Sequence, residues 1–245
     1  MAEILAVDGA RVAVMARGHD ALEDTVASLR ALGSPDAVGI SVDMTDPDSI
    51  AAAFGEVRDR WGSLNVLVHT IGPGAGRFDD LDDAGWDEAF ALGTMSAVRS
   101  VREAVPLLRA AEWARIAIFS AHSIQRQSPM LVAYTASKAA VTSLAKNLAK
   151  SLAPDDILVN AVCPGSIVTA SFTENLREIF AGEGLDPSDP HDVMTWIGQT
   201  FHQPADLGRA GLPDEVASLT AYLVSRRNGY VTGACVNADG GSDFV

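Results

Sequence analysis

The amino-acid sequence predicts an α/β protein in three layers, with helices on both faces of a parallel sheet. Short segments rich in Val, Ile and Leu alternate with longer segments of helical periodicity, which is typical of repeated βα units. Turn residues or helix starters bound each short segment. No internal repeat, low-complexity tract or linker interrupts the 245 residues. We therefore expect one domain over residues 1–245.

The expected strands are six short apolar segments, each of them compatible with burial in a parallel sheet. They cover residues 11–16, 37–42, 65–70, 115–120, 157–162 and 235–238. The residues before the first strand, MAEILAVDGA, resemble the last turns of a helix that leads directly into it.

Three long helices are predicted between these strands. Asp46 and Pro47 begin the first, because Pro is tolerated in the first helical turn, and an apolar stripe of Ile50, Phe54 and Val57 follows. The second carries apolar residues from Trp86 to Leu107, and the third covers about residues 132–152.

Residues 172–211 interrupt this alternation. Two helix-like stretches, one through Leu176 and Phe180 and one from Val193 to Phe201, flank the break GEGLDPSDP. They are either a surface helical pair that packs its own apolar stripe or a lid over a substrate pocket. We favour the lid, because insertions after a late strand often cover α/β active sites. Its Phe, Met and Trp predict a small-molecule substrate of apolar character.

Composition excludes several classes of protein. The formal net charge is -14 and the sequence pI is about 4.6, so the surface repels phosphate backbones and nucleic-acid binding is not expected. No apolar run is long enough to span a membrane and no signal peptide is recognisable, so we expect a cytoplasmic protein. Two cysteines, Cys163 and Cys235, support neither a disulfide framework nor a metal site, and we interpret them as small residues in or near buried strands.

The string YTASK places Tyr134 and Lys138 four residues apart, on one face of the third helix. A free phenol has a pKa of about 10, and a nearby cation favours the phenolate. Lys138 is therefore expected to lower the pKa of Tyr134 and make it a working acid or base. The pair alone is weak evidence, because a solvated lysine beside a tyrosine is common on helices.

Two further strings change that balance. NAVCPGSIVT follows the next strand, and YVTGACVNADGG lies near the C-terminus. With YTASK in this order, the chain from about residue 9 onward resembles the short-chain dehydrogenase/reductase family. The resemblance implies a Rossmann-like, doubly wound sheet. It also implies hydride transfer between a nicotinamide cofactor and a carbonyl or secondary alcohol, and a homo-oligomer, either a dimer or a tetramer.

The same resemblance assigns roles to individual residues. Tyr134 would be the proton donor or acceptor, and Lys138 would also hold the nicotinamide ribose. Asn160 would support the site. Ile167 and Thr169 would touch the carboxamide end of the cofactor. Further contacts with the cofactor would come from Pro164, Gly165 and Gly72, the last of these in the turn HTIG. We expect His69 to be a turn residue near the cofactor.

The preferred cofactor is inferred from the end of the first strand. An acidic residue there selects NAD through the ribose 2′-hydroxyl. This chain instead has Ala16 and Arg17, and arginine suits a 2′-phosphate, so we expect NADP(H) to be preferred over NAD(H). An ordinary surface arginine is the alternative. Asp43 and Met44 resemble the family's adenine-binding pair.

The chain departs from the family pattern at its start. The family's first strand and glycine-rich turn have no counterpart in MAEILAVDGARVAV. That strand would lie at the sheet's centre, and its loss would leave a gap of roughly 10 Å with two unpaired edges. We expect a start placed too far downstream or a truncated product, unless the neighbouring strands close up. GPGAG, at 72–76, is not promptly followed by a helix and so does not fit a phosphate loop.

Two departures concern the catalytic set. Gly93 stands where the family places an asparagine, and Ala121 stands where it places a serine. Ser120 and Ser123 flank Ala121, and we prefer Ser123 as the substitute. His122 is a second possible donor or an exposed loop histidine. The leading hypothesis is an NADP(H)-dependent oxidoreductase. The alternatives are a non-catalytic relative that binds or scaffolds, and an inactive truncated gene product.

Overall fold

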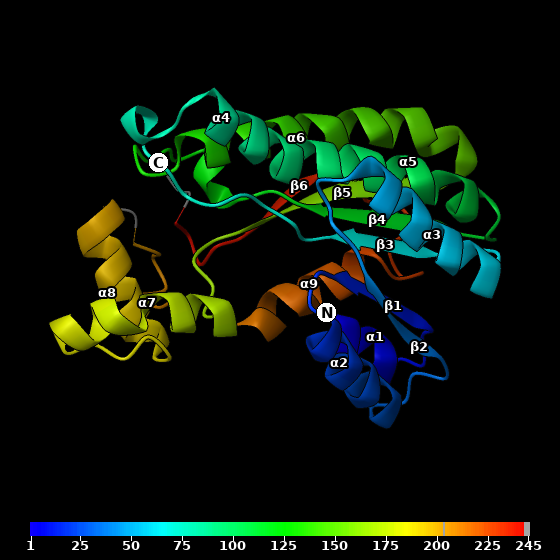
Figure 1. The fold of residues 1–245 in the computed structure, drawn as a ribbon, viewed down its shortest axis with the longest axis horizontal. Helices are drawn as coiled ribbons and strands as arrows, with labels where there is room; N and C mark the ends of the chain where they lie inside the picture. Colours follow the sequence, from blue (N-terminus) through cyan, green and yellow to red (C-terminus); the bar gives the residue numbers. More distant parts are fainter. Residues whose placement is uncertain (203, 243–245) are drawn as a thin grey trace.

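The computed structural model describes residues 1–202 and 204–242, and it has the predicted α/β architecture (Figure 1). Its strands are β1 (Val12–Ala16), β2 (Ala37–Ser41), β3 (Val66–His69), β4 (Ala114–Phe119), β5 (Ile157–Pro164) and β6 (Cys235–Ala238). Its α-helices are α1 (Ala2–Val7), α2 (His19–Ala31), α3 (Pro47–Trp61), α4 (Asp83–Phe90), α5 (Ser96–Arg109), α6 (Val132–Leu152), α7 (Ala170–Glu183), α8 (Pro190–Phe201) and α9 (Pro213–Leu223). The six predicted strand segments are thus confirmed to within two residues at each end.

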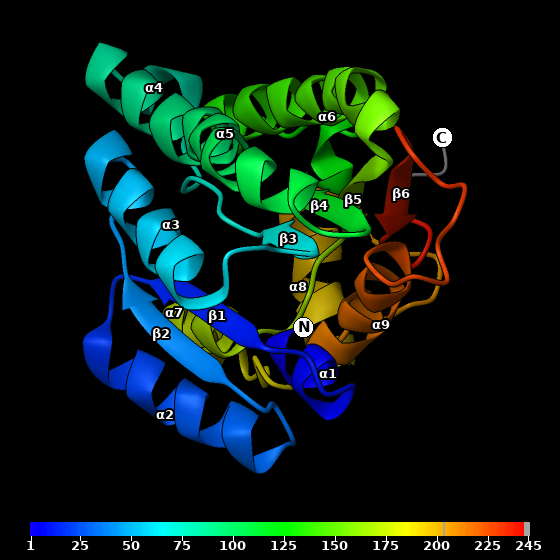
Figure 2. The ribbon, with the colours of Figure 1, turned by 90° about the vertical axis from the view of Figure 1, so that its right-hand side faces the viewer.

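The strands are all parallel but belong to two sheets. β1 pairs with β2, and β3, β4, β5 and β6 form a second sheet in that order. Within the described residues β1 and β3 are not hydrogen-bonded to each other, so the two edges expected from the sequence stay apart rather than close up. Figure 2 shows the pair β1–β2 beside the larger sheet. β4 is buried nearly throughout, whereas Val66, Leu67 and Val68 of β3 are partly exposed.

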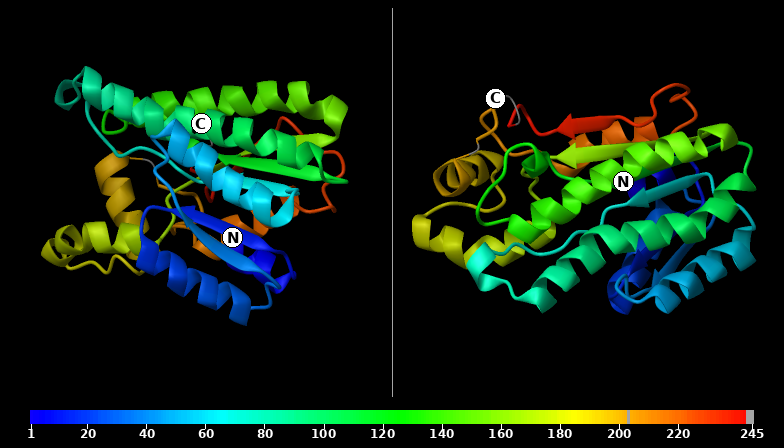
Figure 3. Two further views of the ribbon diagram at one scale, coloured as in Figure 1. Left: turned by 45° about the vertical axis from the view of Figure 1, so that its right-hand side comes forward. Right: turned by 90° about the horizontal axis from the view of Figure 1, so that it is seen from above.

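A single apolar core nevertheless spans both sheets on one face. Helices α3, α5 and α6 cover this face (Figure 3). Its buried members come from both sheets and include Ile40 of β2, Ile116 and Ile118 of β4, and Val159 of β5. On the opposite face, Leu5 of α1 packs against two smaller apolar clusters. One includes Val216 of α9, and the other includes Leu29 of α2. Helices therefore bridge the two sheets on both sides.

Helix α3 begins where the sequence predicts. The Asp46 carboxylate caps its first turn by accepting a hydrogen bond from the Asp48 amide at 3.0 Å, and Pro47 occupies the first position. The helical stretch predicted from Trp86 to Leu107 is confirmed, with one irregularity. A π-turn, η2 (Ala91–Met95), separates α4 from α5 around the buried Gly93.

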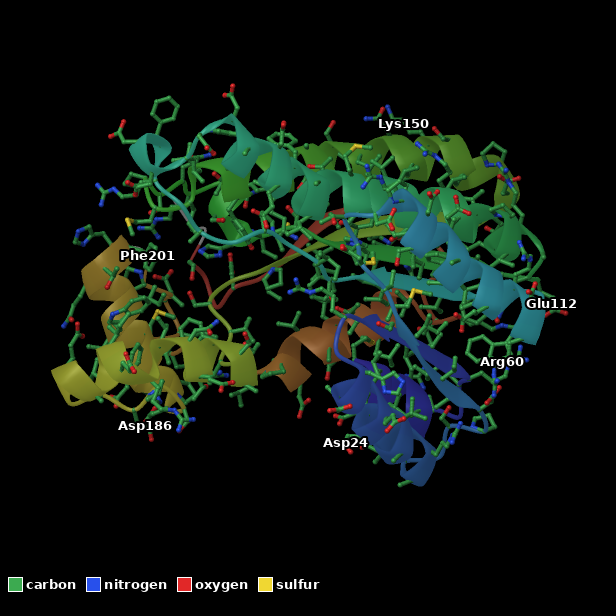
Figure 4. All side chains as sticks on the ribbon, in the orientation of Figure 1. Asp24, Arg60, Glu112, Lys150, Asp186 and Phe201 are labelled. Atoms are coloured by element: carbon green, nitrogen blue, oxygen red, sulfur yellow. The ribbon has the colours of Figure 1, made fainter. Side chains whose placement is uncertain are left out.

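Helices α7 and α8 make up most of segment 172–211, of which residue 203 lies outside the described residues. They pack on each other through a small core centred on the fully buried Phe180, and Trp196 stands between the rings of Phe180 and Phe201. Phe201 ends α8 and is labelled in Figure 4. A backbone bridge between Ile167 and Gly211 closes the base of the segment.

Charged side chains cover the outside of the molecule. Figure 4 places Asp24, Glu112, Lys150 and Asp186 at its periphery, far apart from one another. None of the helices in the described part of the chain combines the length and apolarity that crossing a membrane requires.

The split sheet predicts a pattern of amide hydrogen exchange. In the described part of the chain, β4 and β5 each have a partner strand on both sides, whereas β1 and β3 each have one. Roughly half of the amides in β1 and β3 therefore lack a ladder bond. We expect amides of β1 and β3 to exchange faster than those of β4 and β5 by about two orders of magnitude or more. Residue-resolved exchange measured by NMR tests this. Equal protection of β3 and β4 would show that one continuous sheet exists in solution.

Candidate active site

Lys138 ties helix α6 to the ends of two strands. Its side chain is 2% exposed, and its ammonium donates hydrogen bonds to the carbonyl oxygens of Ile71 at 2.7 Å and Phe119 at 2.8 Å. Ile71 follows β3 and Phe119 ends β4. Burial lowers the pKa of Lys138 to about 8, although a charge on Cys163 opposes this shift.

Gly72 lies against this lysine. A Cβ at Gly72 would come within 2.9 Å of Lys138 Cε, 3.1 Å of Nζ and 3.6 Å of Tyr134 Cε2. The first of these distances is shorter than carbon atoms tolerate, so only glycine fits here without a shift of Lys138. The turn after β3, Lys138 and Tyr134 therefore meet at one place.

Tyr134 departs from the expected electrostatics. The sequence predicts that Lys138 lowers the pKa of the phenol, and this is wrong in the structure. Burial raises the pKa of Tyr134, and a charge on Cys163 raises it further. The phenol therefore stays protonated at neutral pH, which suits it to donate a proton.

The two candidate serines differ in their hydrogen bonds. Ser120 Oγ donates to the Lys138 carbonyl oxygen at 2.9 Å and accepts from Thr142 Oγ1 at 2.8 Å, so its hydroxyl is committed to α6. Ser123 lies in the short helix η3 (His122–Ile124) and is 3% exposed. Its Oγ has no hydrogen-bond partner among the described residues. A buried unpaired hydroxyl costs about 1–3 kcal/mol, so Ser123 is the serine with capacity to bind a ligand.

Gly93 is confined by Ser137. A Cβ on Gly93 would lie 2.7 Å from Ser137 Cβ and would also clash with Ser137 Oγ. Ser137 Oγ donates to the Tyr134 carbonyl oxygen at 2.8 Å, and Thr94 Oγ1 donates to the Ser137 carbonyl oxygen at 3.1 Å. The π-turn and α6 are thus in direct contact where the family pattern has an asparagine.

The residues expected to contact the nicotinamide lie at and after the end of β5. The Gly165 amide donates to the Ala238 carbonyl oxygen at 3.0 Å, and Pro164 O lies 3.2 Å from His122 Nδ1. Thr169 Oγ1 caps α7 by accepting from the Phe172 amide at 3.1 Å. Ile167 forms a backbone bridge with Gly211 and packs against the apolar cluster that includes Val162 of β5 and Val216 of α9.

The residues expected near the adenosine lie on the two-stranded sheet. Arg17 is exposed and follows β1 directly. Asp43 follows β2, and its carboxylate accepts from the Thr45 amide at 2.8 Å and from Thr45 Oγ1 at 2.7 Å. These two bonds, and then the charge of Arg17, lower the pKa of Asp43. Met44 packs into the main core, with 9% of its surface exposed.

One sequence interpretation needs correction. His69 is the last residue of β3 rather than a turn residue, and its Nε2 lies 3.1 Å from Ser96 Oγ. Burial lowers its pKa to about 3, so it is neutral. Asn160 holds the segment before β6 through Val231 O, at 2.8 Å, and the Ala234 amide, at 3.1 Å.

One residue near the site was missed. Cys163 is 1% exposed at the end of β5, and a charge on it raises the pKa of both Tyr134 and Lys138. The sequence predicts a small buried residue at Cys163 but not that it lies near Tyr134 and Lys138. The available signal was its place in the sequence, directly before Pro164 and Gly165.

A parallel sheet flanked by helices, with a buried lysine and a tyrosine at its edge, places the chain in the class of Rossmann-like α/β proteins. A family model described as enoyl-(acyl carrier protein) reductase matches residues 1–243. The chain belongs to the short-chain dehydrogenase/reductase family and is an oxidoreductase.

Named relatives cover nearly all of the chain. D-beta-hydroxybutyrate dehydrogenase of Rhizobium meliloti (strain 1021) is 28% identical over 244 residues, which are 98% of this chain and 92% of that protein. L-Sorbose reductase from Gluconobacter frateurii, solved with NADPH and L-sorbose, is 26% identical with a TM-score of 0.91, covering 100% of this chain and 91% of that one. A variant of actinorhodin polyketide ketoreductase, solved with NADPH, is 28% identical with a TM-score of 0.84, covering 100% and 92%.

The glycines after β3 provide a matched test of the site's packing. Gly72→Ala would push a methyl group into Lys138, whereas Gly74 has nothing within 4 Å of its Cβ position. We expect Gly72→Ala to lower the free energy of unfolding by about 1–3 kcal/mol. Gly74→Ala should change it by less than about 0.5 kcal/mol. Urea unfolding measures both, and equal effects would contradict the contact.

Proposed function

We propose that this protein transfers a hydride between NADP(H) and the carbonyl or secondary alcohol of a small molecule with apolar character. The observation that carries the proposal is the buried Lys138 ammonium, held between two strand ends next to the protonated Tyr134. The hydroxyl of Ser123, which has no hydrogen-bond partner among the residues described, supplies a third polar group.

The residues around Lys138 fit the nicotinamide half of the cofactor. An ammonium has three N–H donors, and the Ile71 and Phe119 carbonyls take two of them. The third suits a ribose hydroxyl. The turn at Gly72 and the β5 end with Pro164, Gly165, Ile167 and Thr169 would line the same place. When bound, the cofactor supplies the hydride chemistry.

The chain's own contribution is a proton and its placement. Because the pKa of Tyr134 is raised, the phenol holds its proton at neutral pH and donates it to the substrate oxygen as negative charge develops there. Ser123 Oγ would donate a hydrogen bond to the same substrate oxygen and fix its position.

The end of β1 favours NADP(H). The exposed Arg17 guanidinium can pair with a 2′-phosphate bidentately. The nearby Asp43 carboxylate is occupied by Thr45, so it is poorly placed to accept a bond from a ribose 2′-hydroxyl. The sorbose reductase and the polyketide ketoreductase were both solved with NADPH.

A second candidate function is a non-catalytic member of the family that binds a ligand without converting it. Gly93 favours this candidate, because Ser137 fills the space next to it and the family's asparagine is absent. The two candidates differ in turnover, not in fold, so substitution of Tyr134 separates them.

Arg17 predicts cofactor selectivity. We expect Arg17→Ala to weaken NADPH binding by about 10- to 100-fold, the loss of a charge-assisted pair, and to change NADH binding by less than about twofold. Lys150→Ala is the control, since it removes one exposed positive charge on α6. Nicotinamide fluorescence titrations of the wild-type chain and both variants with NADPH and NADH measure these affinities. If both variants lost the same NADPH affinity, Arg17 would act only through the net charge of the protein and not through a contact with the 2′-phosphate.

Tyr134 and Ser123 predict turnover. We expect Tyr134→Phe to lower kcat for carbonyl reduction by about 10²- to 10⁴-fold, because the transferable proton is removed and the ring is kept. Ser123→Ala should lower it by about 10- to 100-fold. Tyr230→Phe is the matched control, because Tyr230 is 96% exposed. Steady-state NADPH oxidation with a panel of apolar ketones and aldehydes reports each effect. Unchanged turnover in Tyr134→Phe would refute the assigned role, and binding of NADPH without turnover of any carbonyl would favour the second candidate.

A further inference from the structure

The chain's two cysteines meet beside the proposed active site. Cys163 lies on β5 and Cys235 begins β6, the neighbouring strand. Their Sγ atoms are 3.0 Å apart, and both residues are thiols in the structure. The strand register pairs Ala161 with Cys235, so Cys163 is two residues further along and faces the same side of the sheet.

This side of the sheet carries the proposed catalytic groups. Ala161 and Cys235 both pack into the core beneath α5 and α6. A charge on Cys163 raises the pKa of Tyr134 and of Lys138, so the sulfur lies within electrostatic range of both. Cys163 is 1% exposed, whereas Cys235 is partly exposed. An oxidant from solvent therefore reaches Cys235 first.

We propose that Cys163 and Cys235 are an oxidation site at which hydrogen peroxide forms a reversible intrachain disulfide. Peroxide transfers one oxygen to Cys235, giving a sulfenic acid and one water. The Cys163 sulfur then attacks the Cys235 sulfur and displaces hydroxide, which takes the thiol proton and leaves as a second water. The two thiols lose two electrons in total, and the peroxide gains them.

Disulfide formation would change the proposed active site by moving the backbone at the ends of β5 and β6. An S–S bond is about 2.05 Å long, so the sulfurs must approach by about 1 Å. The ends of β5 and β6 are already joined, since the Gly165 amide donates to Ala238 O. A Cβ on Gly165 would also lie 2.7 Å from Asp239 Cα, so the two backbones have no space to slide independently. The movement of β5 that brings the sulfurs together therefore also moves the backbone of Pro164 and Gly165.

The test uses the full chain and its thiol count. The folded protein is treated with a small excess of hydrogen peroxide, and the remaining thiols are counted under denaturing conditions. We expect both titratable thiols to disappear, the intact mass to fall by about 2 Da, and the chain to stay monomeric on a non-reducing gel. Trypsin should then release peptides 151–177 and 228–245 as one cross-linked species that dithiothreitol separates.

Variants and alternative products make the result decisive. Cys235→Ser should keep the Cys163 thiol after the same treatment, because Cys163 is buried. Cys163→Ser should gain the mass of one oxygen at position 235. If the wild-type chain retains both thiols, gains oxygen without forming a cross-link, or forms disulfide-linked dimers, the proposal is overturned. Because the wild-type result decides, poor folding of either variant does not matter.

A second readout rests on the proposed function. Peroxide should lower NADPH-dependent carbonyl reduction by the wild-type chain at least fivefold, and dithiothreitol should restore it. Cys235→Ser should have ordinary activity that peroxide leaves unchanged. A cross-link without this loss would refute only the coupling to Tyr134. Absence of turnover in the untreated chain would refute the proposed function and leave the oxidation site intact.

Discussion

The buried ammonium of Lys138 is the contact on which the site's geometry depends. A charge taken out of water needs compensating acceptors, and here the carbonyls of Ile71 and Phe119 provide them. Ile71 follows β3 and Phe119 ends β4, so these bonds fix the position of α6 along the two strands. The position of α6 along the strands places Tyr134 next to Gly72 and sets the position of the loop that carries Ser123. Removal of the ammonium would leave these two carbonyls without their donor. The position of Tyr134 relative to β3 and β4 would then no longer be fixed.

The fold could be predicted from the sequence to a large extent, because its strands and helices are encoded locally. Buried parallel strands show as short Val-, Ile- and Leu-rich runs, and Asp46 with Pro47 marks a helix start by chemistry that needs no distant partner. The register of Tyr134 and Lys138 is equally local, since it depends only on helical periodicity. Each of these features is complete within about five residues of chain.

Features that depend on contacts between distant segments could not be predicted. The π-turn places Gly93 against Ser137 of a distant helix, and the pKa of Tyr134 is governed by burial rather than by its neighbour on the helix. Choosing between Ser120 and Ser123 required knowing that Thr142 and the Lys138 carbonyl occupy the Ser120 hydroxyl. The meeting of Cys163 and Cys235 depends on the order of the strands, which neither residue's surroundings in the sequence reveal.

The contact between Gly93 and Ser137 also constrains how this chain can evolve. A Cβ at position 93 collides with the Ser137 side chain, so the family's asparagine cannot return by a single substitution without displacing α6. Glycine at 137 would have to come first, because the Cβ of any other residue there would still collide, and it would be neutral or slightly harmful until position 93 changed. The two positions are therefore epistatic. A homologue with a side chain at 93 should carry glycine at 137, or a helix shifted outward, and chimaeras that exchange only one of the two segments should fold poorly.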